Sequence, residues 1–90
     1  MDPEQLADRY VRDADALAAE KRYDEAVAVY DLAIGVYAEC TEAWTNKASV
    51  LRLQGRRREA LECTERALEI GPFPIAETLR EILIEELNRR

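Results

Sequence analysis

The feature that most constrains this chain is a set of helix-packing residues that recurs after 34 residues. Small residues are needed where two helices approach closely, and larger side chains fill the space around the crossing. No insertion interrupts the register, so the sequence predicts two copies of one helix-turn-helix unit. The matching pairs are Tyr10 and Trp44, Ala14 and Ala48, Leu17 and Leu51, Glu25 and Glu59, Ala26 and Ala60, and Ala33 and Ala67.

The second copy shows the unit most completely, between Thr41 and Pro72. A first helical run contains Trp44, a polar turn follows at Gly55, and a second helical run stops before Pro72, because proline cannot continue a helix. The arrangement resembles the tetratricopeptide repeat, a helix-turn-helix unit of about 34 residues. The resemblance covers about residues 7–72. It implies an all-α, right-handed superhelix of stacked antiparallel helix pairs.

The expected architecture is a single domain over residues 1–90. Repeat 1 is assigned to about residues 7–40, repeat 2 to residues 41–74 and a capping helix to residues 75–90. Asp2, Asp24 and Thr41 are the expected N-caps, and Gly55 is expected in the left-handed conformation that closes a helix. Repeat 1 lacks a closing proline, so its second helix could continue to Glu39. Helical periodicity and breaks place helices at about residues 3–20, 24–38, 42–54, 57–70 and 74–88.

The last predicted helix does not repeat the core pattern. In the 34-residue register, Thr78, Glu81 and Glu85 stand where a repeat has aromatic or apolar residues, and only Ile82 falls in a core position. One interpretation is that this helix covers the open end of repeat 2. The other is that its apolar strip contacts a second copy of the chain or a partner. The residues assigned to self-association are Leu79, Leu83, Ile84 and Leu87.

Composition argues against several classes of partner. The chain is 48% hydrophobic and 36% charged, with a net charge of -6 and no histidine. An acidic chain binds phosphate backbones and anionic membranes poorly, and no apolar run is long enough to span a bilayer. No signal-peptide pattern is present, so a cytoplasmic location is expected. Cys40 and Cys63 cannot hold zinc by themselves; reduced thiols are expected, with a disulfide as the alternative.

No sequence pattern indicates catalysis. Histidine, a Gly-rich phosphate loop, a nucleophile elbow and a metal-ligand cluster are all missing. The carboxylates fall on outward helical positions, which is typical of a solvated face. We therefore expect a protein that is not an enzyme and needs no cofactor.

The resemblance implies that the chain binds a protein or peptide in a groove lined by the first helix of each unit. Arg12, Asn46 and Arg80 are equivalent positions in this register and are expected to form a column across the groove. Guanidinium groups beside an amide can hold carboxylates and a peptide backbone, so the partner could be acidic. Only Asn46 and Arg80 match the two-carboxylate clamp of some family members, and Asp15 has the wrong charge for it. The other groove candidates are Asp8, Val11, Asp15, Glu42, Thr45, Ser49, Arg52 and Leu53.

Other interpretations of these residues remain open. The groove candidates could be ordinary surface side chains. The chain could be a self-associating scaffold that forms a homodimer through its last helix. It could also contact RNA through the arginine turn at residues 56–58. A DNA-reading unit would need a basic recognition helix, whereas the helix after this turn carries Glu59, Glu62, Glu65 and Glu69.

Overall fold

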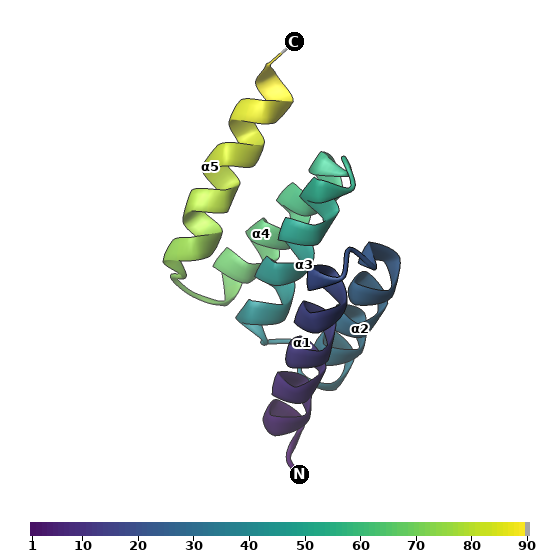
Figure 1. The fold of residues 1–90 in the computed structure, drawn as a ribbon. Helices are drawn as coiled ribbons and strands as arrows, with labels where there is room; N and C mark the ends of the chain where they lie inside the picture. The colour runs from purple at the N-terminus through teal and green to yellow at the C-terminus, as the bar shows by residue number, and fades with distance from the viewer. Residues whose placement is uncertain (90) are drawn as a thin grey trace.

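The computed structural model describes residues 1–89, and these residues form helices without a β-strand. Two antiparallel helix pairs, α1 with α2 and α3 with α4, lie side by side, and α5 packs against the second pair (Figure 1). The predicted all-α repeat architecture is confirmed, and the helix ends agree with the predicted ends to within two residues. The helices are α1 (Pro3–Ala19), α2 (Tyr23–Val36), α3 (Thr41–Leu53), α4 (Arg57–Ile70) and α5 (Pro74–Asn88).

The first helix begins with the predicted cap. The Asp2 carboxylate accepts a hydrogen bond from the Gln5 backbone N–H at 2.8 Å, and the Asp2 backbone N–H donates to Gln5 Oε1 at 3.1 Å. These two bonds form a reciprocal capping box, which satisfies N–H groups that have no partner within the helix.

Two other predicted caps are wrong. The residues before α2 and α3 are Arg22 and Cys40, and neither forms a side-chain capping bond. Asp24 instead accepts a hydrogen bond from Gln54 Nε2 at 2.6 Å, so its carboxylate links repeat 1 to repeat 2. Helix α2 also stops at Val36 rather than continuing to residue 39, because the next backbone position is already extended.

The packing core is built around alanines. The recurring residues Ala14, Ala26, Ala33, Ala48, Ala60 and Ala67 are all fully buried. One cluster joins α1, α2 and the near side of α3, and a second joins α3, α4 and α5. Because alanine adds little bulk, the helix axes can approach closely, and Tyr30 and Leu51 fill the space beside them.

The core face of α5 differs from the predicted one. Ile82, the only residue in a core position of the repeat register, is 38% exposed. Ala76, Leu79 and Leu83 are buried instead, and the two leucines belong to the cluster shared with α3 and α4. Helix α5 therefore turns a different face inward than a repeat helix would. Glu81 and Glu85 occupy the positions that a repeat helix buries, and burying their charged carboxylates would cost free energy. The interpretation of α5 as a covering helix agrees with this packing.

The turns inside the two hairpins share one backbone conformation. Lys21 and Gly55, which are 34 positions apart, have positive φ angles of 64° and 80°. Gly55 therefore adopts the predicted left-handed conformation. A residue with a Cβ adopts this conformation at a cost of roughly 1–2 kcal/mol, which glycine avoids.

This difference gives a paired stability prediction. Lys21→Gly should raise the free energy of unfolding by about 1 kcal/mol, and Gly55→Ala should lower it by a similar amount. Urea unfolding of both variants and the parent chain measures the two shifts. Shifts of the same sign in both variants would contradict the conformations described for these turns.

Candidate interaction surface

Three strips of exposed or half-buried side chains from α1, α3 and α5 form the surface that we call the groove face. A helix presents residues three and four positions apart on one side, and each strip follows this spacing. A hydrogen bond between α1 and α3 and a hollow between α3 and α5 connect the strips. The strips are Glu4, Asp8, Arg12 and Asp15 of α1; Glu42, Asn46, Ser49 and Leu53 of α3; and Ile75, Thr78 and Ile82 of α5.

The apolar part of the groove face is a hollow of about 400 Å³ between α3 and α5. Ile75 is 64% exposed and Ile82 38% exposed at this hollow, and Leu53, one turn after Ser49, is 61% exposed. Large aliphatic side chains that gather on an otherwise charged surface are typical of a contact site. The hollow is lined by Ser49, Pro74, Ile75, Thr78, Leu79 and Ile82.

Asp15 connects the α1 and α3 strips. Its Oδ1 atom accepts hydrogen bonds from the Tyr30 hydroxyl and, at 3.1 Å, from Asn46 Nδ2. Burial raises the pKa of Tyr30 well above its usual value, and the bond to Asp15 raises it further, so the hydroxyl remains a donor. The carboxylate thus fixes α1 against α2 and α3, and the Asn46 amide is already engaged.

The predicted basic column does not form. Arg80 lies beside Glu65 of α4, with Nε 3.8 Å from Oε2, and therefore faces away from Asn46. Arg12 lies at a separate hollow with Asp8 and other residues near the N-terminus. The physical reason is the rotation of α5, which carries Arg80 out of the register predicted from the 34-residue spacing.

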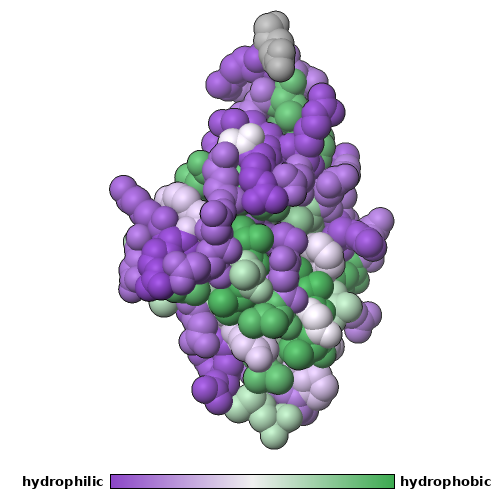
Figure 2. Space-filling model, turned by 90° about the vertical axis from the view of Figure 1, so that its right-hand side faces the viewer, coloured by the Kyte–Doolittle hydropathy of each residue, from purple (hydrophilic) through white to green (hydrophobic). Residues whose placement is uncertain are grey.

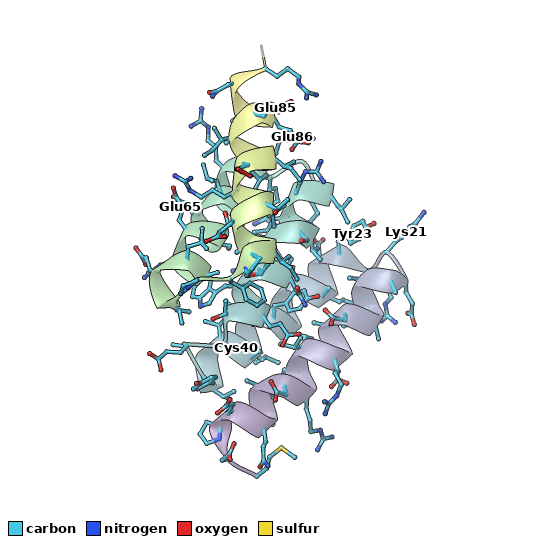
Figure 3. All side chains as sticks on the ribbon, turned by 90° about the vertical axis from the view of Figure 1, so that its left-hand side faces the viewer. Lys21, Tyr23, Cys40, Glu65, Glu85 and Glu86 are labelled. Atoms are coloured by element: carbon cyan, nitrogen blue, oxygen red, sulfur yellow. The ribbon has the colours of Figure 1, made fainter. Side chains whose placement is uncertain are left out.

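Arg52 is also engaged within the chain. Its Nε and Nη2 atoms donate to the two oxygens of Glu86 at 2.9 Å and 2.5 Å, and Arg57 Nε donates to Glu86 Oε1 at 3.1 Å. Figure 3 shows Glu86 on the upper part of α5. The bidentate pair joins α3 to α5, and Arg57 adds the start of α4, so Arg52 has a structural partner rather than a free guanidinium.

Carboxylates gather at the other end of the groove face. Burial raises the pKa of the Cys40 thiol, and the negative charges of Asp8, Glu42 and Glu4 raise it further. Glu4 and Asp8 lie in the first two turns of α1 and Glu42 in the first turn of α3. Cys40, just before α3, packs in the same buried cluster as Ala7 of α1. The basic and amide groups predicted for the groove are Arg12, Asn46, Arg52 and Arg80. Among residues 1–89, Arg12 is the one of these four that forms no hydrogen bond or ion pair.

The residues predicted for self-association have two different positions. Leu79 is 7% exposed and Leu83 fully buried, so their assignment to a surface is wrong: both pack inside the chain. Ile84 and Leu87 are half-buried. Self-association through α5 is not tested by these positions and stays a prediction.

Helix α2 carries an exposed apolar strip that was not predicted from the sequence. Ala28, Leu32 and Val36 are exposed, and Leu32 reaches 51%. Figure 2, which faces the α2 side of Figure 1, shows apolar side chains gathered there between hydrophilic ones. A comparison of the two repeats could have predicted the strip. The residues 34 positions later are Glu62, Arg66 and Ile70, so repeat 1 has apolar residues at two outward positions where repeat 2 has charged ones.

The arginine turn is largely neutralised. Arg56 forms an ion pair with Glu59 at 2.7 Å, and Arg57 pairs with Glu86. Arg58 is exposed beside a polar hollow of about 810 Å³ at the start of α4. The paired arginines add no net basic surface for RNA phosphates, which require unpaired cations.

Residues 1–89 contain neither a metal-binding cluster nor a membrane-spanning helix. Within residues 1–89, no group of three or more acidic, cysteine or histidine side chains is arranged to hold a metal ion. Both cysteines are buried and carry free thiols. None of the helices in this range combines the length and apolar character that crossing a bilayer requires.

Comparisons with known proteins agree with the repeat pattern. The tetratricopeptide repeat description matches residues 7–40 and again residues 41–73. The chain therefore belongs to the tetratricopeptide repeat family, whose members generally act as protein-interaction repeats rather than enzymes. No match is found among curated proteins.

A solved structure supports the same fold. The structure of YrrB, described as a TPR protein with an unusual peptide-binding site, aligns with a TM-score of 0.83 and 21% sequence identity. The alignment covers 89% of this chain and 42% of the YrrB chain. The chain thus spans less than half of that protein, and the likeness at this identity concerns the fold.

The Glu86 cluster gives a pH-dependent prediction. Hydrogen bonds from Arg52, and then from Arg57, lower the pKa of Glu86 from 4.5 to about 2. A carboxylate with a lowered pKa in the folded state stabilises the fold above its unfolded pKa, and the contribution disappears as the pH falls toward the folded value. Glu86→Gln should therefore be less stable than the parent chain at pH 7, with the difference shrinking between pH 4.5 and pH 2.

Urea unfolding of both proteins across this pH range measures the difference. Glu77→Gln is the matched control, because Glu77 is exposed on the outer side of the same helix. A Glu86→Gln difference that stays constant as the pH falls would contradict the account of this cluster.

Proposed function

We propose that this chain binds a segment of a partner protein along the groove face. The observation that carries the proposal is the apolar hollow between α3 and α5, where Ile75 and Ile82 remain exposed beside Ser49. Membership of the tetratricopeptide repeat family supports an interaction role in general. A concave apolar hollow with a few polar groups nearby is the usual form of a binding site.

The geometry supports a short segment of chain as the ligand. Neighbouring packed helices lie about 8–10 Å apart, and an extended chain rises about 3.3 Å per residue. A segment that crosses the three strips would therefore place roughly every third residue over a helix. Ser49 stands at the middle strip and borders the hollow, so such a segment would pass directly over it.

A bulky residue at this position tests the proposal. Ser49→Tyr should fill the mouth of the hollow and weaken binding of peptides selected on the parent chain from a displayed random library by about tenfold, as measured by fluorescence anisotropy. Ser49 is exposed, so the fold should persist. The control is Ala28→Tyr, which adds a similar ring to the exposed side of α2.

The two variants separate the possible outcomes. Normal binding by Ala28→Tyr together with the loss in Ser49→Tyr is the expected result. If Ser49→Tyr binds the selected peptides as well as the parent chain does, the partner segment does not use the groove face and the proposal is wrong.

A further inference from the structure

We infer that the segment bound on the groove face carries an apolar side chain and, about three residues away, lysine or arginine. The inference rests on the proposed function and names the chemistry of the partner at the same surface. It differs from the acidic partner that the sequence predicted, since Arg52 and Arg80, two of the arginines on which that prediction depended, pair with Glu86 and Glu65.

The apolar residue belongs at the α3–α5 hollow. Ile75 and Ile82 line this hollow and remain exposed, and Leu53, one helical turn after Ser49, is also exposed. Covering them with an aliphatic or aromatic side chain removes apolar area from water, which favours binding. A charged side chain placed there would lose hydration without gaining a partner.

The basic residues belong one helix further along, over α1 and the start of α3. This part of the groove face carries Glu4, Asp8, Asp15 and Glu42 and a single cation, Arg12. Asn46 donates to Asp15 at 3.1 Å and lies one helical turn after Glu42 on the same side of α3, so Asp15 and Glu42 belong to neighbouring parts of this surface. A cationic side chain of a bound segment would meet these exposed carboxylates with complementary charge.

Asp15 retains capacity to accept further hydrogen bonds. Both of its hydrogen bonds within residues 1–89 end on Oδ1, so Oδ2 can still accept a donor from a bound segment. The bond from Asn46 also fixes the carboxylate in place. A fixed carboxylate loses less conformational freedom when it pairs with a ligand than a mobile side chain does.

Alternative occupants fit these charges less well. An acidic segment would meet the carboxylates of α1 and α3, because Glu86 and Glu65 already occupy Arg52 and Arg80. The spacing follows from the distance between adjacent helices, about 10 Å, which an extended chain covers in about three residues. The partner motif is therefore an apolar residue separated by about two residues from a basic one.

The experiment selects peptides from a displayed random library on the full chain and compares the enriched sequences. We expect enrichment of an apolar residue with lysine or arginine about three positions away. Binding of a selected peptide should weaken about tenfold in the double variant Ile75→Ser and Ile82→Ser. The control is Leu32→Ser on α2, where an exposed leucine changes to the same residue.

A second pair of variants tests the charges. Asp8→Asn combined with Glu42→Gln should weaken binding of the same peptide about tenfold and reduce its dependence on salt, because salt screens exposed charges. Glu77→Gln, on the outer side of α5, should leave binding unchanged. Circular dichroism of each variant verifies that the helices are retained.

The outcomes distinguish this inference from the proposed function. If the enriched peptides are acidic and lose binding in Ser49→Tyr, the groove face binds partners but the inferred motif is wrong. If the apolar and charge variants bind a selected peptide normally while Ser49→Tyr does not, the motif is again wrong. If neither Ser49→Tyr nor these variants affect binding, both proposals fail.

Discussion

The close approach of paired helices at buried alanines is the constraint on which the rest of the structure depends. Six alanines, three in each repeat, have no exposed surface and stand at matching positions of the two hairpins. Larger residues there would separate the helices or force side chains from their preferred rotamers, at a cost of typically 1–3 kcal/mol. The alanines therefore determine how each hairpin closes, and the repeated spacing determines how the hairpins stack. That stacking brings the outward strips of α1, α3 and α5 to one side.

Polar contacts between the repeats refine this arrangement. Asp31 of α2 pairs with Lys47 of α3 at 2.6 Å, and Asp24 accepts a hydrogen bond from Gln54 at 2.6 Å. The Arg52–Glu86 pair holds α5 against α3. Exposed ion pairs contribute little stability each, but their geometry fixes the register of neighbouring helices. The same contacts occupy side chains that would otherwise serve a ligand, and this is why the charge of the groove face cannot be read from residue types alone.

The sequence predicted the fold well because helical spacing, caps and breaks are local signals that the packing then reinforces. The helix pairs, the buried alanines, the Asp2 cap and the left-handed Gly55 all follow from residues near one another or one repeat apart. The site was harder to predict, since it depends on which face α5 turns inward. Sequence spacing placed Arg80 in a column with Asn46, whereas burial of Leu79 and Leu83 rotates Arg80 toward Glu65. Ser49 and Asp15 do lie on the groove face, but Asp15 marks its acidic side rather than a basic pocket.

The most direct test of the account is an NMR titration of the ¹⁵N-labelled chain with a peptide selected on it. The account predicts that the amide resonances that shift belong to the groove face, around Asp15, Ser49 and Ile82, with little change on the outer sides of α2 and α4. Shifts concentrated instead around Leu32 and Glu62 would show that the stacked repeats bind partners on the opposite side and would contradict the central claim.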